Sequence, residues 1–157
     1  MNLLKKYQSL IFFLLVISFD VITKYFTQAY LPLHGSAVFP YGGIAIFENF
    51  FGISFCLQHQ SNTGAAWGFF ADYPLTLLLF RICFVSLLVL YLWQVKPKNS
   101  LAFICILAGA VGNIVDIFLY GHVIDMLHFT FWGYHYPVFN LADSFIFIGV
   151  VFLLFFH

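Results

Sequence analysis

Charged side chains are scarce in this sequence. Lys, Arg, Asp and Glu together make up 8% of its 157 residues, whereas a typical soluble domain carries about 25%. Hydrophobic residues account for 63% of the chain, so apolar side chains stand where charged ones would be expected. This composition excludes an ordinary water-soluble enzyme and predicts an integral membrane protein.

Other functional signals are also missing. The formal net charge is zero and there is no basic stripe, which argues against nucleic-acid binding. Cys56, Cys83 and Cys105 show no paired spacing, and the histidines form no H-x-x-x-H pair. Neither a disulfide framework nor a metal site is therefore expected. No motif places a serine nucleophile beside a histidine, so a serine hydrolase has little support.

Long apolar runs, in contrast, are abundant. Four of them, at about residues 9–26, 74–95, 101–119 and 139–156, are long enough to span a membrane. The first follows Lys5 and Lys6, but no small-x-small cleavage site comes after it, so we expect an uncleaved span. Residues 1–157 are therefore predicted to form a single, mainly helical membrane domain with four spans.

The segment from about residue 30 to residue 70 differs from the rest. Prolines and glycines interrupt any helix there, residues 44–47 are β-like, and residues 53–58 alternate apolar and polar side chains as a strand does. Strands cannot lie in lipid with unpaired backbone groups. We therefore expect a small β-rich insertion outside the bilayer, between the first and second spans. Residues 120–137 are expected to form a second outer loop.

The charges predict the orientation in the membrane. Four spans put both termini on one side, together with four of the six basic residues: Lys5, Lys6, Lys96 and Lys98. The positive-inside rule makes that side the cytoplasm. The acidic residues then lie outside or toward the outer ends of spans, namely Asp20, Glu48, Asp72, Asp116, Asp125 and Asp143.

Two polar patterns lie inside the predicted spans. Asp20 and Lys24 are four residues apart, which places them on one helix face and predicts an ion pair that stabilises a helix end. Gly109, Gly112, Asn113 and Asp116 form one helical stripe. Small residues on such a stripe let another helix approach closely, so Asn113 and Asp116 should point into that contact rather than toward lipid.

Asp143 stands at the start of the last apolar run, three residues after Asn140. It could be a simple helix N-terminal charge that the helix dipole favours. It could instead belong to a pair of carboxyl groups, because two held close together cannot both ionise cheaply. One then keeps a proton and the other activates water against an amide carbonyl. The residues alone leave open an aspartyl hydrolase or a four-helix membrane protein of another kind.

Five short motifs occur in order along the chain. They are D-x-x-T-K at 20–24, N-T-G-A-A-W at 62–67, G-x-x-G-N-x-x-D at 109–116, G-x-V-x-D at 121–125 and F-N-x-A-D-S at 139–144. Each motif alone is weak. Together, with four spans and an outer β element, the chain resembles the bacterial lipoprotein signal peptidases (signal peptidase II), a family of membrane aspartyl peptidases.

The resemblance implies an endopeptidase that removes the signal peptide from diacylglyceryl-modified prolipoproteins, cutting just before the lipidated cysteine. It implies Asp125 and Asp143 as the catalytic pair. It also implies a group of substrate-binding or supporting residues, namely Asn62, Gly64, Asn113, Asp116, Asn140, Asp20 and Lys24. No metal or organic cofactor is implied. The expected location is the bacterial inner (plasma) membrane, with the site on the extracytoplasmic side and the protein acting as a monomer among membrane lipids.

The chain departs from the family pattern at one position near the site. The family usually has Arg directly after the aspartate of G-N-x-x-D, whereas this chain has Ile117. We expect Lys24 or Arg81 to replace that cation, or Asp116 to be protonated. The Ile117 departure is the one feature that favours an alternative function, a catalytically impaired assembly factor on the same scaffold. A small four-helix transporter is a second alternative.

Overall fold

The computed structural model describes residues 3–33, 36–64, 70, 72–97 and 99–155. Its helices are α1 (Leu3–Tyr30), α2 (Pro74–Val95), α3 (Ser100–Tyr120) and α4 (Leu141–Phe155). The first three contain apolar stretches of at least 21 residues, long enough to cross a membrane, whereas α4 is apolar but has 15 residues. The helices therefore match the predicted apolar runs in position, with the fourth shorter than expected.

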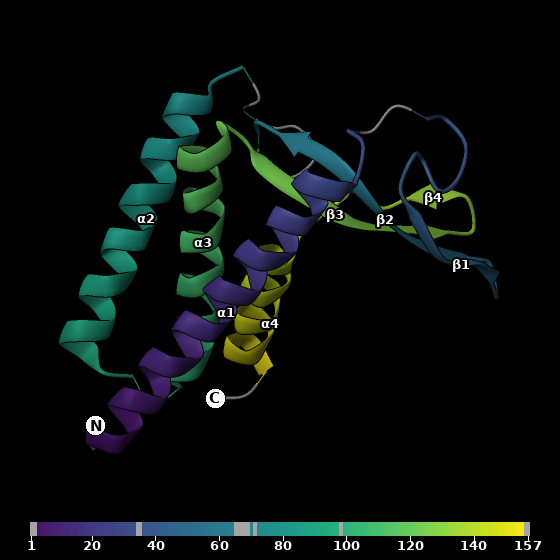
Figure 1. Ribbon diagram of the computed structural model, residues 1–157. Coiled ribbons are helices and arrows are strands. Elements are labelled where there is room, and N and C mark those ends of the chain that lie inside the picture. Colours follow the sequence, from purple (N-terminus) through teal and green to yellow (C-terminus); the bar gives the residue numbers. More distant parts are fainter. Residues whose placement is uncertain (1–2, 34–35, 65–69, 71, 98, 156–157) are drawn as a thin grey trace.

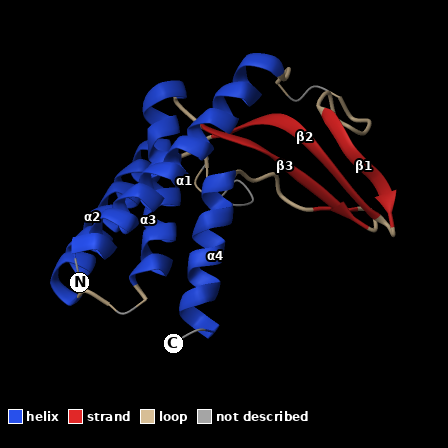
Figure 2. Ribbon diagram, turned by 60° about the horizontal axis from the view of Figure 1, so that its bottom comes forward, coloured by secondary structure: helices blue, strands red, loops and turns tan. Residues whose placement is uncertain are grey.

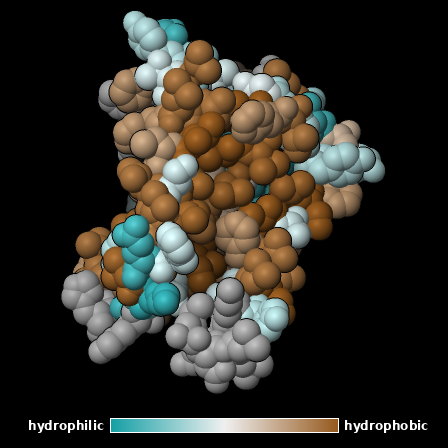
Figure 3. Space-filling view, turned by 90° about the vertical axis from the view of Figure 1, so that its left-hand side faces the viewer, coloured by the Kyte–Doolittle hydropathy of each residue, from teal (hydrophilic) through white to brown (hydrophobic). Residues whose placement is uncertain are grey.

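The helix α3 is the centre of the bundle and packs against α1, α2 and α4 (Figure 1). Its buried residues include Asn113 and Asp116, which confirms that these polar groups point into helix contacts. The helix α2, in contrast, has no buried residue. Figure 3 shows that the α2 side of the molecule is mostly apolar at its surface. An apolar helix face without a protein partner is what a membrane protein presents to lipid.

Glycines bring α3 and α4 into close contact. A methyl group at Gly109 would collide with the carbonyl oxygen of Ala142, and one at Gly112 would lie 2.7 Å from a carboxylate oxygen of Asp20. A methyl group at Gly149 on α4 would lie 2.6 Å from the carbonyl oxygen of Ala102 on α3. The predicted close approach of a second helix to the Gly109 stripe is therefore confirmed.

The β element is a four-stranded antiparallel sheet in the order β1-β2-β3-β4 (Figure 2). The predicted insertion supplies β1 (Ile44–Phe50) and β2 (Ile53–Asn62), as the sequence indicated. The segment 120–137 was expected to be a loop, and this was wrong, because it supplies β3 (Val123–Phe131) and β4 (Tyr134–His135). Residues 123–126 are all buried, so β3 lacks the apolar–polar alternation that marks a strand with one wet face.

The sheet lies at one end of the helix bundle, and both termini lie at the other (Figure 1). The turn between α2 and α3, which carries Lys96, is also at the end with the termini. Strand β3 follows the end of α3 and leads back toward the start of α4. The chain is thereby folded so that the last residues of β2, the first residues of β3 and the first turn of α4 meet where sheet and bundle join.

Candidate active site

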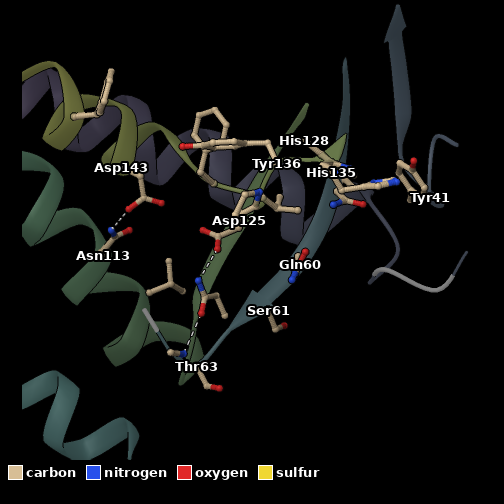
Figure 4. A pocket seen from close by; sticks show the side chains of 18 of the residues that line it. Tyr41, Gln60, Ser61, Thr63, Asn113, Asp125, His128, His135, Tyr136 and Asp143 are labelled. Carbon is tan, nitrogen blue, oxygen red and sulfur yellow. Dashed lines mark hydrogen bonds between the residues drawn. The ribbon is translucent and has the colours of Figure 1, made fainter. Parts of the chain in front are cut away.

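A cavity of about 1070 Å³ opens where the sheet meets the helices (Figure 4). Five of the nine predicted site residues line it: Asn62, Gly64, Asn113, Asp125 and Asp143. The other four form a buried layer next to it: Asp20, Lys24, Asp116 and Asn140. All five motifs that the sequence singled out thus contribute residues to one place. Ala65–Trp67 of the second motif lie outside the described residues.

Asp125 reaches the cavity from β3 and is only 2% exposed. One of its carboxylate oxygens accepts a hydrogen bond from the Asn62 amide at 2.8 Å, and the other accepts one from the Asn140 amide at 2.7 Å. Immediately after Asp125, the backbone amides of Met126 and Leu127 both donate to the carbonyl oxygen of Phe139, at 3.1 and 2.7 Å. Two amides on one carbonyl mark a β-bulge, a feature that redirects side chains along a strand.

Asp143 lies in the first turn of α4. Its backbone amide donates to the side-chain oxygen of Asn140 at 2.9 Å, while its own carboxylate accepts the Asn140 backbone amide at 3.3 Å. This reciprocal pair is a capping box, which satisfies two amides that a helix start leaves without partners. The reading of Asp143 as an N-terminal helix charge is therefore correct, but incomplete, because the same carboxylate also lines the cavity.

The asparagine side chains are oriented by their partners. The oxygen of Asn62 accepts the Gly64 backbone amide at 3.0 Å, so its nitrogen must face Asp125. The oxygen of Asn113 accepts from Lys24 and from Asn140, each at 3.1 Å. Its nitrogen therefore donates to Asp143, at 2.8 Å. Each amide thus has one arrangement that satisfies all of its neighbours.

Lys24 is completely buried and holds three partners. Its ammonium group lies 2.7 Å from a carboxylate oxygen of Asp20 and 2.7 Å from one of Asp116, in addition to Asn113. The predicted Asp20–Lys24 ion pair is therefore confirmed, and it extends to α3. A buried cation between two carboxylates compensates charges that would otherwise be costly in the protein interior.

The two carboxylates of this ionic cluster also bind backbone amides. Asp20 accepts the amide of Ala142 at 2.9 Å, and Asp116 accepts the amide of Ile124 at 3.2 Å. Ala142 immediately precedes Asp143, and Ile124 immediately precedes Asp125. The cluster therefore fixes the backbone next to both cavity carboxylates, one through α4 and the other through β3.

The absence of Arg at Ile117 is thereby explained. Asp116 does not lose its cation, because Lys24 supplies one from α1 at 2.7 Å. Arg81, the other residue expected to substitute, instead donates from its guanidinium group to the carbonyl oxygen of Gly64 at 3.0 Å. That contact holds Gly64, whose backbone amide also donates to Asn62.

Burial and, to a smaller extent, the nearby Asp143 carboxylate together raise the pKa of Asp125 from its ordinary value of 3.8 to about 7. Hydrogen bonds from Asn62 and Asn140 oppose the shift without cancelling it. Two carboxyl groups that face one cavity with one of them protonated near neutral pH can supply an acid and a base together. Among the described residues, no three His, Cys, Asp or Glu side chains are placed to hold a metal ion.

Sequence reasoning missed the rings at the sheet end of the cavity. Tyr41, His128, His135 and Tyr136 all line it (Figure 4). No motif contains them, and three of them lie in the segment that was expected to be a loop. The enrichment of residues 123–131 in β-branched and aromatic types was a usable strand signal, and it would have placed His128 on the same strand as Asp125.

Comparison with known proteins identifies the family. The profile of the family described as Signal peptidase (SPase) II matches residues 12–157. The lipoprotein signal peptidase of Chlamydia trachomatis serovar L2 is 37% identical over 147 residues, which cover 90% of this chain and 85% of that protein. The lipoprotein signal peptidase of Desulforapulum autotrophicum is 37% identical over 145 residues, covering 87% and 83%.

Solved structures agree with the sequence comparison. Two structures described as bacterial membrane enzymes superpose with TM-scores of 0.79 and 0.74, at 26% and 27% identity. Both comparisons cover 94% of this chain, with 85% and 90% of the solved chains. The family match rests on sequence over nearly the whole chain and not on the geometry of the cavity. It agrees with the presence of two aspartates in that cavity. The chain therefore belongs to the signal peptidase II family.

Proposed function

We propose that this protein is an aspartyl endopeptidase that removes the signal peptide from diacylglyceryl-modified prolipoproteins, with Asp125 and Asp143 as its catalytic pair. One observation carries the proposal: two carboxyl groups from different elements face a single cavity, and each is held by its own set of amides. Family membership supplies the substrate class. The cut would fall on the amino side of the lipidated cysteine.

The different surroundings of the two carboxyl groups suggest different roles. Asp125, with its pKa raised to about 7 by burial, would donate a hydrogen bond to the scissile carbonyl oxygen in its protonated form. Asp143 would take a proton from water as the water oxygen attacks the carbonyl carbon. When the carbon–nitrogen bond breaks, Asp143 passes the proton that it took from water to the leaving amine, so atoms and charge balance.

The supporting residues would act by holding this pair. Asn62, Asn113 and Asn140 fix the carboxylate orientations through hydrogen bonds of 2.7–2.8 Å to Asp125 and Asp143. Asp20, Asp116 and Lys24 fix the backbone beside them. Preorganised groups of this kind cost no rearrangement when charge develops during a reaction.

The proposed topology has four spans, both termini in the cytoplasm and the cavity on the outer side of the bacterial inner membrane. The helix α4 would span about 22 Å at 1.5 Å per residue, short for a hydrocarbon core of about 30 Å. Residues on either side of it, or local thinning of the bilayer, would make up the difference. All the supporting residues come from one chain, so we expect a monomer to be sufficient for activity.

The proposal is tested by replacing each aspartate with asparagine, which keeps the side-chain shape. Purified Asp125→Asn and Asp143→Asn proteins should fold but lose cleavage of a synthetic diacylated lipobox peptide, by at least about 10³-fold. Glu48→Gln is a matched control, because Glu48 is an exposed carboxylate on β1, and it should cleave at the wild-type rate. Unchanged cleavage by either aspartate variant would remove that residue from the mechanism.

The two alternatives receive less support. An impaired assembly factor was suggested by Ile117, but Lys24 supplies the cation that Asp116 needs. A transporter would place its carboxylates near the bilayer midplane, between repeated halves. Here Asp125 lies on the sheet and Asp143 in the first turn of α4, so neither carboxylate lies midway along a helix.

A further inference from the structure

Three rings gather at the sheet end of the cavity, away from Asp143 (Figure 4). The ring centres of Tyr41 and His128 are 5.0 Å apart, those of Tyr41 and His135 are 5.7 Å apart, and those of the two histidines are 5.4 Å apart. We call Tyr41, His128 and His135 the ring cluster. All three line the same cavity as the two aspartates, and none of them takes part in the proposed mechanism.

The fold fixes the ring cluster in place. Tyr41 lies in a turn before β1, where its amide donates to the carbonyl oxygen of Val38 at 2.7 Å. His128 is on β3, is 6% exposed and lies opposite Cys56 of β2, with the two side chains 3.9 Å apart. Cys56 is fully buried, and burial raises the pKa of its thiol. This cysteine is therefore a packing partner of His128 rather than a nucleophile.

The β-bulge after Asp125 connects the ring cluster to the catalytic pair. Residues three apart on a regular strand point to opposite faces. The bulge at Met126 and Leu127 changes this alternation, and both Asp125 and His128 face the cavity. Three residues of strand span roughly 10 Å. A peptide bound in an extended form would therefore reach the ring cluster about three residues from the bond that the aspartates cut.

The cavity changes in polarity along its length. Its α4 side is lined by the apolar residues Ile146, Phe147 and Val150, whereas the side formed by β2 is lined by the polar residues Gln58, Gln60 and Ser61. Gln60 lies opposite Asp125, and the strands continue from there to the ring cluster. An apolar signal peptide fits the α4 side, which continues into the bilayer. The part of a substrate that follows the cut is outside the bilayer and would lie along the sheet. Its side chains would there meet two imidazoles and a phenol.

We propose that the ring cluster is a specificity subsite that reads the residues following the lipidated cysteine and prefers hydroxyl or carboxylate side chains there over amines. This inference rests on the proposed function. Imidazole and phenol groups can donate hydrogen bonds to such oxygens, and among the described residues that line the cavity only Asp125 and Asp143 are acidic. A lysine at this position of the substrate would find no carboxylate in the ring cluster to pair with.

The test uses three diacylated lipobox peptides. One ends at the lipidated cysteine, and the other two continue for four residues. The second of these four, which is the third residue after the cut, is either Asp or Lys. Wild-type protein should cleave the Asp peptide with a kcat/KM about tenfold above that of the Lys peptide, as expected for one hydrogen bond to a charged group. His135→Ala should reduce this ratio to below about twofold, mainly through KM, and Tyr41→Phe should reduce it in part.

Tyr134→Ala is the matched control, because Tyr134 is the neighbour of His135 on β4, is 58% exposed and does not line the cavity. It should keep the wild-type ratio. Equal cleavage of the Asp and Lys peptides by wild type, or an unchanged ratio in His135→Ala, would overturn the subsite alone. Failure of wild type to cleave even the short peptide would overturn the proposed function as well.

A lipid headgroup is the competing occupant. His135→Ala would then weaken cleavage of all three peptides alike. It would also weaken binding to phosphatidylcholine vesicles that contain phosphatidylglycerol, relative to vesicles of phosphatidylcholine alone. That pair of results would assign the ring cluster to lipid and overturn its role in peptide specificity.

Discussion

At the scale of single residues, Asp125 and Asp143 carry the same carboxyl group but lie in different environments. Asp125 is 2% exposed on a strand, whereas Asp143 lies in a helix first turn, where the dipole and two amides favour a negative charge. Such a contrast separates an acid from a base within one pair. The sequence could indicate both residues through their motifs, but only the fold shows which one is more deeply buried.

The pKa of Asp125, raised to about 7 by burial and by Asp143, predicts how activity depends on pH. If protonated Asp125 is the acid, kcat/KM should fall about tenfold per pH unit above about pH 7. A pH–rate profile with the short diacylated peptide measures this. A profile that stays flat to pH 9 would contradict the assignment of Asp125 as the acid.

The same shift predicts the pH dependence of stability. The folded protein holds the Asp125 proton more tightly than the unfolded chain, so this contribution is full below about pH 4 and is lost as the pH rises to about 7. Thermal unfolding in detergent should therefore show a decline for wild type over this range. Asp125→Asn cannot ionise and serves as the control, so its decline should be smaller.

At the scale of elements, the ionic cluster around Lys24 joins α1 to α3 directly and, through backbone amides, to α4 and β3. Asp20 and Lys24 are neighbours on α1, whereas Asp116 lies 92 residues after Lys24 on α3. Their shared role is therefore a property of how the elements pack. The cluster secures the start of α4 and the start of β3 against the central helix.

Replacing Lys24 with methionine keeps the length of the side chain but leaves Asp20 and Asp116 buried without their cation. We expect a loss of about 3–5 kcal/mol in unfolding free energy, the usual cost of breaking a buried ion pair from one side. Thermal unfolding in detergent measures the change. Lys96→Met, at an exposed position after α2, should stay within about 0.5 kcal/mol of wild type.

A rescue experiment separates charge from packing. Adding Asp20→Asn and Asp116→Asn to Lys24→Met removes both uncompensated carboxylates and should recover part of the lost stability. No recovery would mean that the ammonium group matters through its fit rather than through its charge. Wild-type stability of Lys24→Met itself would contradict the role assigned to the cluster.

Sequence reasoning succeeded for the elements whose pattern is local. The long apolar runs predicted the helices, and the glycine stripe predicted where α3 meets α4. Strand β3 was missed because the start of the strand is buried on both faces, so its pattern does not alternate. Lys24 was only one of three options for compensating the charge of Asp116. It lies 92 positions before Asp116 in the sequence, and only packing brings the two residues together.

At the scale of the whole molecule, charge and shape are aligned along one axis. The sheet lies toward one end, and the termini and the turn with Lys96 lie at the other (Figure 1). The cavity is lined by residues of the sheet and by Asp125 and Asp143. The middle is apolar, as the α2 face shows (Figure 3). A molecule with this distribution has one favourable depth in a bilayer, and the positive-inside rule then selects one orientation.

This orientation predicts which engineered cysteines a membrane-impermeant maleimide can reach in spheroplasts. A Cys83→Ser background removes the exposed native cysteine, while Cys56 and Cys105 are buried. Tyr134→Cys, on the sheet, should be labelled from outside. Lys96→Cys should react only after the membrane is permeabilised, because it stands at the end with the termini.

The labelling pattern also tests the fourth span. With three spans, the sheet end of α4 would share a side with the C-terminus, so a cysteine added after His157 would be labelled together with Tyr134→Cys. With four spans, that added cysteine should behave like Lys96→Cys. A 15-residue α4 then has to cross the bilayer with help from neighbouring residues or from thinning. Labelling of the added cysteine in intact spheroplasts would therefore place the last helix within one leaflet and would require a different route for the signal peptide into the cavity.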